Sequence, residues 1–418
     1  YPASIQRITF DENGVVVELV RDEPSPRDIG LNPYIAGPPI RVQEMFFGRQ
    51  ATLKWVEEQL VGKHGHNVLI LYGERRPGKT SVLYHIEGLP RFGGGRYVFA
   101  LLDLQQMAYW LNTTAHFYSG LAHRLRDKLA ETRITLAPPS LTDFETMPGL
   151  RFDEFIRDAV AALQGRTLVI MLDEFDLLLD RFRRGLIDLS VADHIRALIQ
   201  HQNQLAFIFT GAHSVRAMVE DPKTILFNTA FRRQIGFLAE SDARQLICLP
   251  VEGLVEYDDL AVDRILDVTH GHPYFIQYIC HTLFEAIKAE NRHAIDLTDV
   301  IDALPHVIQD AMGNIANGYA QLSAEHRVIL AALARVVGQG RRYVGIEEVV
   351  QKLEEYNINI LRRERDQLIE DLKRRDFIEG DPPASIERIG FTMDLVKMWL
   401  SQQADHEMRD YQGLSNVI

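Results

Sequence analysis

Residues 73–80 combine glycines, a lysine and a threonine in the spacing of a phosphate-binding loop. The segment reads Gly-Glu-Arg-Arg-Pro-Gly-Lys-Thr, between an apolar run at 67–72 and a helical pattern at 79–88. Backbone N–H groups of such a loop surround phosphate oxygens at a helix N-terminus, where the helix dipole also favours anions. Lys79 is placed to reach the β- and γ-phosphates, and the Thr80 hydroxyl to hold Mg²⁺. The loop therefore predicts binding of a nucleoside triphosphate.

A second run supplies two adjacent carboxylates at the end of an apolar strand. The strand covers 167–172 and is followed by Asp173 and Glu174. Asp173 is expected to hold the Mg²⁺ shell through water, and Glu174 to take a proton from the attacking water. Glu174 and Lys79 are therefore the catalytic candidates for phosphoanhydride hydrolysis. Thr80 and Asp173 are the candidate metal ligands.

A third apolar strand, at 205–210, ends in polar residues. Its C-terminal end places Thr210 and His213 where they could approach the γ-phosphate. A strand that simply ends in a turn explains these two side chains equally well. Other chemistry has little support in the sequence. The fifteen histidines lack zinc-site spacing, and the two cysteines, Cys248 and Cys280, lie in apolar helical patterns typical of buried thiols.

The elements that must position these residues alternate along the chain. Apolar strands are expected at 67–72, 97–103, 167–172 and 205–210, and helices at 79–88, 113–131, 151–164 and 190–204. That alternation indicates an α/β domain with a parallel sheet buried on both faces. After Pro250 the pattern becomes helical, and near the C-terminus three helical patterns precede two short strands, which indicates a winged helix.

The pattern divides the chain into five parts. They are an N-terminal β-hairpin and linker (1–28), a P-loop nucleotide-binding domain (29–252), a helical lid domain (253–318), a winged-helix domain (319–402) and a tail (403–418). The hairpin is expected because two short strand patterns meet at Asn13-Gly14, a strong turn signal.

Composition narrows the class of protein further. The chain has 418 residues, of which 46% are hydrophobic and 25% charged, enough for two or three ordinary domains. A formal net charge of −13 argues against a protein that coats nucleic acid or a membrane with its whole surface. No apolar stretch predicts a membrane span and no leader opens the chain, so a cytoplasmic protein is expected. Because the first residue is Tyr1, the sequence is expected to be a piece of a longer one.

Several motifs together resemble the STAND ATPases, signal-transduction switches related to AAA+ proteins, and in particular their archaeal and bacterial branch. The resemblance covers about residues 30–400. Besides the phosphate loop and the carboxylate strand, it rests on segments 32–39, 45–49 and 270–273. It implies the sheet order 5-1-4-3-2, with the strand at 205–210 between the two strands that carry the motifs.

The resemblance also implies a site for ATP or ADP with Mg²⁺. Segment 32–39 followed by segment 45–49 would line an adenine pocket, and Pro273 would pack against the nucleotide. Phe47 would lie on the adenine face, although a core phenylalanine beside a turn is the alternative. Sensing of the γ-phosphate would fall to His213, to Arg75 or Arg76, or to no residue among them. The candidate nucleotide-binding residues are Asn32, Pro33, Tyr34, Phe47, Gly48, Arg49, Gly73, Arg75, Arg76, Pro77, Gly78, Lys79, Thr80, Ser81, Thr210, His213 and Pro273.

The resulting hypothesis is a nucleotide-dependent switch with slow ATP hydrolysis. ADP would hold the domains closed, and exchange for ATP would open them toward self-association. The expected partners are nucleotide, a second copy of the chain in the ATP state, and an effector or sensor for a signalling or defence output. That partner would lie in missing sequence or in another chain.

Two alternatives remain open. One is a DNA-associated AAA+-like ATPase whose winged helix reads DNA, and the other is a scaffold that binds nucleotide without useful turnover. Residues 321–400 hold 13 Lys and Arg against 14 Asp and Glu, a net charge of −1. A DNA-binding module is usually basic, so nucleic acid is not expected as a partner.

Overall fold

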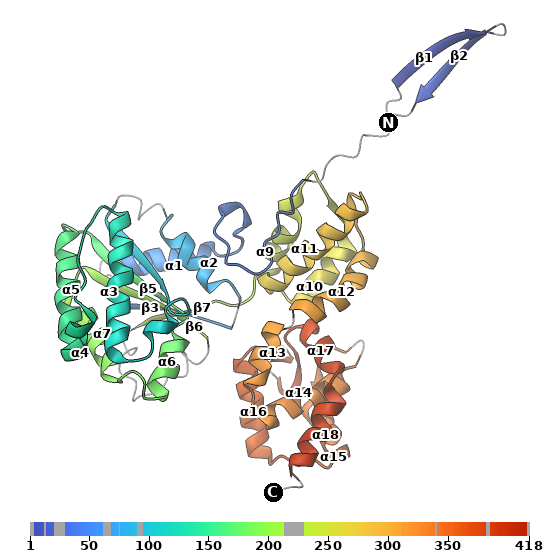
Figure 1. Ribbon diagram of the computed structural model, residues 1–418. Coiled ribbons are helices and arrows are strands. Elements are labelled where there is room, and N and C mark those ends of the chain that lie inside the picture. Colours follow the sequence, from blue (N-terminus) through green and yellow to red (C-terminus); the bar gives the residue numbers. More distant parts are fainter. Residues whose placement is uncertain are drawn as a thin grey trace.

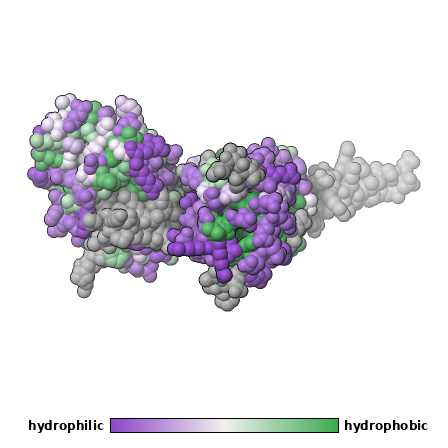
Figure 2. Space-filling model, turned by 90° about the horizontal axis from the view of Figure 1, so that it is seen from below, coloured by the Kyte–Doolittle hydropathy of each residue, from purple (hydrophilic) through white to green (hydrophobic). Residues whose placement is uncertain are grey.

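The computed structural model describes most of the chain. The described residues are 4–11, 14–20, 30–61, 68–74, 76–89, 95–212, 230–311, 313–338, 341–381 and 385–415. They form an α/β domain followed by two smaller, mainly helical bodies (Figure 1). In the view of Figure 2 the described surface is mostly hydrophilic, with smaller apolar areas. Within the described residues, no helix is both long and apolar enough to cross a membrane.

A five-stranded parallel sheet forms the centre of the α/β domain. Its strands are β3(Val68–Tyr72), β4(Tyr97–Asp103), β5(Thr167–Asp173), β6(Leu205–Gly211) and β7(Phe231–Gln234). They are ordered β4-β5-β6-β3-β7, and every neighbouring pair is parallel. This is the expected order 5-1-4-3-2 counted from the other edge. As expected, β6 lies between the two strands that carry the phosphate loop and the paired carboxylates.

Helices cover both faces of this sheet. They are α1(Gln50–Val61), α2(Lys79–Ile86), α3(Thr114–Glu131), α4(Leu141–Thr146), α5(Pro148–Ala162), α6(Asp176–Arg183) and α7(Ser190–His201). Because side chains alternate along a strand, Leu69 and Leu71 of β3 join the core beneath α1 and α2. Ile70 joins the core beneath α3, α5 and α7. The two helical layers lie on opposite sides of the sheet (Figure 1), which confirms a sheet buried on both faces.

The lid follows the sheet domain. It contains α9(Glu240–Cys248), α10(Asp259–Thr269), α11(Pro273–Ala289), α12(Leu297–Ala311) and α13(Gly313–Ala320), with the short strands β8(Glu256–Tyr257) and β9(Ala294–Ile295). Helix α9 precedes the expected lid boundary at 253, but it is grouped here with the lid because its Ala243, Leu246 and Ile247 share a hydrophobic core with α10 and α11. His270 ends α10 in the left-handed region, at φ 52°, and Pro273 occupies the first turn of α11. Proline suits that position because the first N–H groups of a helix have no partner within it. Single turns of 3₁₀ helix within the described ranges include η1(Gln43–Met45), η2(Ala108–Trp110) and η4(Leu249–Val251).

The C-terminal body has the element order expected of a winged helix. It contains α14(Ala324–Val337), β10(Val344–Gly345), α15(Ile346–Glu355), α16(Arg362–Arg374), β11(Ile378–Asp381) and β12(Ser385–Phe391), followed by α17(Asp394–Ser401) and α18(Ala404–Ser415). The strands form an antiparallel sheet in the order β10-β12-β11. Within the expected tail, Ala404–Ser415 form helix α18, in which Ala404 and Met408 are fully buried. Asp405 of α18 accepts a hydrogen bond of 2.9 Å from Arg335 of α14.

At the N-terminus, β1(Ser4–Asp11) and β2(Gly14–Val20) pair antiparallel with Asp11 opposite Gly14. This agrees with the expected hairpin, although Asn13 lies outside the described residues. The two cysteines are free thiols. Cys280 is fully buried, and burial raises the pKa of its thiol to about 12. Cys248 is only half-buried.

Candidate nucleotide-binding site

The phosphate loop runs from the end of β3 into the N-terminus of α2. Gly78 is the N-cap of α2 and adopts φ 98°, a left-handed conformation that favours glycine. Gly73 donates its N–H to the carbonyl of Gly211, 3.1 Å away. A side chain at position 73 would collide with the backbone carbonyl of Ile235. The two glycines of the motif are therefore required by the fold, one for its dihedral angles and one for close packing.

Lys79 lies inside this loop and is 5% exposed. Its ammonium group donates to the carbonyl oxygens of Gly73 at 2.9 Å and Glu74 at 2.6 Å. Burial lowers the pKa of Lys79, and the carboxylates of Glu174, Asp176 and Asp173 act in the opposite direction. To contact a phosphate, this ammonium group would exchange carbonyl oxygens for phosphate oxygens, which are stronger acceptors because they are charged.

Asp173 is the centre of a cluster of oxygen atoms. Its Oδ2 accepts a hydrogen bond from the Thr80 hydroxyl at 2.6 Å, and its Oδ1 accepts one from the Thr210 hydroxyl. Oδ1 also lies 3.1 Å from the backbone N–H of Glu174. Asp173 is 2% exposed and Thr210 is fully buried. A threonine hydroxyl beside a carboxylate is a donor set that suits Mg²⁺, which prefers oxygen ligands.

Glu174 follows Asp173 with an unusual backbone. Its φ is 56°, in the left-handed region that costs a non-glycine residue about 1–2 kcal/mol. The N–H of Glu174 lies 3.3 Å from the Thr210 hydroxyl, on the neighbouring strand β6. Strained residues of this kind cluster at functional sites. Glu174 lines the same pocket as Lys79 and Thr80.

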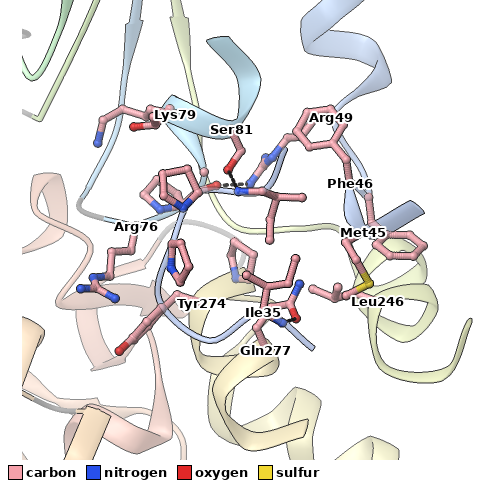
Figure 3. A pocket seen from close by; sticks show the side chains of 18 of the residues that line it. Ile35, Met45, Phe46, Arg49, Arg76, Lys79, Ser81, Leu246, Tyr274 and Gln277 are labelled. Atoms are coloured by element: carbon pink, nitrogen blue, oxygen red, sulfur yellow. Dashed lines mark hydrogen bonds between the residues drawn. The ribbon is translucent and has the colours of Figure 1, made fainter. Parts of the chain in front are cut away.

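The pocket lies where the phosphate loop, the segment 35–49 and the lid helix α11 meet (Figure 3). Figure 3 shows Lys79 and Ser81 from the phosphate-loop side, and Tyr274 and Gln277 from α11. The predicted site residues that line it are Phe47, Arg49, Arg76, Pro77, Gly78, Lys79, Thr80, Ser81, Glu174 and Pro273. An apolar wall is added by Ile35, Met45, Phe46 and Leu246. The first three belong to the segments 32–39 and 45–49 of the resemblance, although they were not predicted individually, and Leu246 had no signal in the sequence.

Two predicted residues, Asn32 and Tyr34, anchor the segment that begins at Gly30 on the lid instead of lining the pocket. Tyr34 is 3% exposed and donates its hydroxyl to the carbonyl of Ile247. Asn32 donates its amide to the carbonyl of His281 at 3.1 Å. Pro33 lies between these two residues in the sequence and is not among the described residues that line the pocket. The segment then crosses to the sheet domain, where the N–H of Ile40 donates to the Ser81 hydroxyl at 2.9 Å.

Arg49 ties the same segment to the phosphate loop. Its guanidinium donates to the carbonyls of Pro77 and Gly236, both at 2.7 Å. The side chain is 8% exposed, and burial lowers the pKa of its guanidinium to about 10, against the opposing charge of Asp242. Next to it, Gly48 adopts φ 69°, and a side chain at this position would collide with Asp242 and Leu238. Gly48 is not among the described residues that line the pocket.

Two further predicted nucleotide-binding residues are described but do not line the pocket, and two lie outside the described residues. Thr210 points at Asp173, as described above, and Gly73 packs on Ile235; neither is among the described residues that line the pocket. Arg75 and His213 lie outside the described residues. Tyr274 and Gln277 were missed, although both line the pocket. They are three residues apart in the first turns of α11, a spacing that places two side chains on one face of a helix and could have indicated them.

Comparison with known proteins bears on the fold. No family model matches the chain, and no curated protein matches it. A Walker-type ATPase of Pyrococcus abyssi aligns with a TM-score of 0.64 at 16% identity, over 87% of this chain and 98% of that one. The ORC2 protein of Aeropyrum pernix, solved as ADPNP-ADP complexes, aligns with a TM-score of 0.61 at 15% identity, over 93% of this chain and 98% of that one. This chain shares the Walker ATPase fold. At such low identity the likeness concerns the fold alone, but its coverage extends beyond the sheet domain.

Proposed function

We propose that this chain is an ATP- and ADP-binding P-loop ATPase that works as a STAND-type switch. The observation that carries the proposal is the composition of the pocket wall. Lys79 and Thr80 come from the phosphate loop, whereas Pro273, Tyr274 and Gln277 come from the lid helix α11. A nucleotide in this pocket would contact both bodies at once, so its identity can bias how they are arranged.

The base end of the pocket suits a nucleobase. Ile35, Met45, Phe46 and Leu246 supply apolar surface for packing against a planar ring. Gln277 is 4% exposed and accepts the N–H of Ile35 at 2.9 Å, which fixes the position of this wall. The charged residues among the described lining residues are Arg49, Arg76, Lys79 and Glu174. Arg49 and Lys79 donate to carbonyls of the phosphate loop, and Glu174 adjoins Asp173. These three charged residues therefore lie at the phosphate end of the pocket.

Hydrolysis would follow from the groups at the phosphate end. Thr80 and Asp173 would hold Mg²⁺, which neutralises phosphate charge when it is bound. Lys79 would hold the β- and γ-phosphates by charge-assisted hydrogen bonds. Glu174, whose backbone is fixed by Asp173 and Thr210, would accept a proton from the attacking water. The proposed reaction is ATP plus water giving ADP and phosphate, at a slow, regulatory rate.

The switch requires that ADP and ATP stabilise different arrangements of the domains. A ligand shifts such an equilibrium only by its differential affinity for the two states. In the proposal, ADP favours the arrangement in which the lid closes the pocket. Exchange for ATP opens it, which allows self-association and engagement of an effector or sensor in a signalling or defence response.

The first test is to purify the chain without added nucleotide, denature it, and identify the released nucleotide by chromatography. About one ADP per chain is expected if the resting switch is closed. Size-exclusion chromatography with ADP and with a non-hydrolysable ATP analogue then tests self-association. The proposal is overturned if neither nucleotide binds, or if both leave domain arrangement and assembly unchanged.

A second candidate is a DNA-associated ATPase, and the exposed face of α16 favours it. Arg362, Arg363, Gln367 and Arg374 line a shallow depression on this third helix of the C-terminal body. Asp366 and Glu370 lie among these basic residues. The third helix is the element that such a domain would place in the major groove of DNA. Duplex binding that weakens steeply with salt, and that is lost in an Arg362→Ala and Arg363→Ala double variant, would favour this candidate.

A third candidate is a scaffold that binds nucleotide without useful turnover. Its distinguishing property is that assembly and partner binding do not depend on an occupied phosphate loop. A Lys79→Ala variant separates it from the switch. If that variant loses nucleotide but assembles as the unaltered protein does, the scaffold is favoured and the switch is rejected.

A further inference from the structure

Arg76 of the phosphate loop lies on the ring of Tyr274 in the lid. The Cζ atom of Arg76 is 4.2 Å from the centroid of the Tyr274 ring, a distance at which a guanidinium is attracted by the π-electrons. In Figure 3 the two side chains lie together, across the pocket from Phe46 and Met45. This contact joins the loop that would hold phosphate to the first turn of α11.

The same two residues border a second pocket. Arg76 and Tyr274 line the nucleotide pocket, and they also line a mainly apolar pocket whose far wall includes Phe377, Met393 and Val396 of the C-terminal body. The pair therefore forms the partition between the nucleotide site and the junction with that body. Any displacement of Arg76 or Tyr274 changes both sides of the partition.

The backbone of the loop is strained at Arg76. Arg76 adopts φ 67°, a left-handed conformation that is unfavourable for a residue with a side chain. The neighbouring Lys79 ammonium group donates to the carbonyls of Gly73 and Glu74 within the same loop. A triphosphate would draw both cations toward its oxygens, because a guanidinium binds phosphate through strong paired hydrogen bonds.

We infer that the Arg76–Tyr274 pair discriminates between nucleoside diphosphate and triphosphate. The inference rests on the proposed function, since it assigns to this pair the differential affinity that the switch requires. With diphosphate bound, Arg76 stays on the Tyr274 ring and the partition is intact. With triphosphate bound, the γ-phosphate draws the Arg76 guanidinium off the Tyr274 ring, so the partition between the two pockets opens. The second pocket then loses the wall that Arg76 and Tyr274 form opposite Phe377 and Met393.

The test compares the affinities for ADP and for a non-hydrolysable ATP analogue, both with Mg²⁺, in single variants. Tyr274→Leu removes the ring that competes for Arg76, so the ratio of analogue affinity to ADP affinity is expected to rise about three- to tenfold. Tyr274→Phe is the matched control, because it keeps an aromatic face and is expected to keep the ratio of the unaltered protein. Arg76→Ala is expected to lower the ratio, and Arg76→Lys, which lacks the planar fork, to lower it less.

The distance between a label on the sheet domain and a label on the C-terminal body measures directly how these two bodies are arranged. Glu58 of α1 and Glu355 of α15 have side chains that are 51% and 59% exposed, so cysteines placed there can be labelled in a Cys248→Ser background. Cys280 is fully buried. The label separation is expected to differ between ADP and the ATP analogue in the Tyr274→Phe protein. In Arg76→Ala the difference is expected to disappear.

The outcomes separate the two claims. If the protein with native Arg76 and Tyr274 shows the same label separation with both nucleotides, the proposed switch is rejected. The other informative outcome is that the label separation differs between ADP and the ATP analogue in the unaltered protein and also in Tyr274→Leu and Arg76→Ala, and that both variants keep the unaltered affinity ratio. The proposed switch is then supported, and the role of the Arg76–Tyr274 pair is rejected. Circular dichroism of each variant ensures that only folded protein is compared.

Discussion

The hydroxyl oxygen of Thr80 lies 2.6 Å from Oδ2 of Asp173, across 93 positions of the sequence. Thr80 is in the first turn of α2 and Asp173 ends β5, two places away from β3 in the sheet. The parallel sheet brings them together because the C-terminal ends of its strands share one edge. A hydroxyl and a carboxylate held in this way form a preorganised pair of oxygen ligands.

Replacing Asp173 by asparagine should therefore remove the Mg²⁺ dependence of nucleotide binding. The amide keeps the size of the side chain but loses its charge, so ATP affinity in Mg²⁺ is expected to fall at least about tenfold, equivalent to about 1.4 kcal/mol. Affinity in EDTA should change little. Titration of a fluorescent ATP analogue in both buffers measures this, with Thr80→Ser as the variant that keeps the hydroxyl. Equal Mg²⁺ dependence in Asp173→Asn would rule out the assignment.

Glu174→Gln is expected to slow ATP hydrolysis while ATP still binds. Glutamine has the same length and the same backbone requirement at φ 56°, but it cannot accept the proton of the attacking water. Loss of a general base typically costs about 10²- to 10⁴-fold in rate. Phosphate release and equilibrium ATP binding are measured side by side, with the exposed Glu58→Gln as control. A hydrolysis rate that stays unchanged would place the base elsewhere.

Arg49→Met should destabilise the sheet domain. The change leaves the carbonyls of Pro77 and Gly236 without their 2.7 Å donors. Buried polar groups without partners cost about 1–3 kcal/mol, so the free energy of unfolding is expected to fall by that amount. Arg184→Met, at a side chain that is 63% exposed, should change it by less than about 0.5 kcal/mol. Urea titrations measure both, and equal effects would contradict the anchoring role of Arg49.

The junction between the lid and the C-terminal body should weaken in acid. His270 accepts a hydrogen bond from Arg342, and burial, followed by the charge of Arg342, lowers the pKa of His270 below its ordinary 6.5. Glu379, Asp394 and Asp267 oppose this effect. The unfolded chain thus binds the proton at a higher pH than the folded chain. Stability is lost as pH falls from about 6.5 toward the lowered value.

The measurement is the free energy of unfolding across this pH range. His270→Asn removes the titrating group and keeps a residue that tolerates the left-handed backbone at φ 52°. Its pH slope should be shallower than that of the unaltered protein. Some slope should remain, because burial also lowers the pKa of His326. An identical slope in His270→Asn would show that this histidine does not contribute.

Helix α18 should be part of the C-terminal core. Met408 is fully buried there, so Met408→Ala is expected to cost about 2–5 kcal/mol of unfolding free energy. His406→Ala is the control, since that side chain is 79% exposed on the same helix. Thermal unfolding followed by circular dichroism compares them. Similar values for the two variants would mean that α18 is dispensable.

Sequence patterns identified elements whose signal is local. The strands β3, β4, β5 and β6 follow apolar runs, and the glycines of the phosphate loop follow a fixed spacing. Strand β7 was not found, because its residues Phe-Arg-Arg-Gln are mostly exposed and lack an apolar run. Its place at the sheet edge was implied only through the resemblance to STAND ATPases, which gave the five-strand order.

The sequence alone determined the phosphate loop, the paired carboxylates and an α/β domain followed by a helical lid and a body with winged-helix element order, since each depends on residues close together in the chain. Only the tertiary structure decided that Tyr274 meets Arg76 and that Thr210 holds Asp173. It also decided that Arg49 binds backbone carbonyls of the loop and its neighbour. These contacts join segments far apart in sequence, so they depend on how strands, loops and helices pack, which no local pattern records.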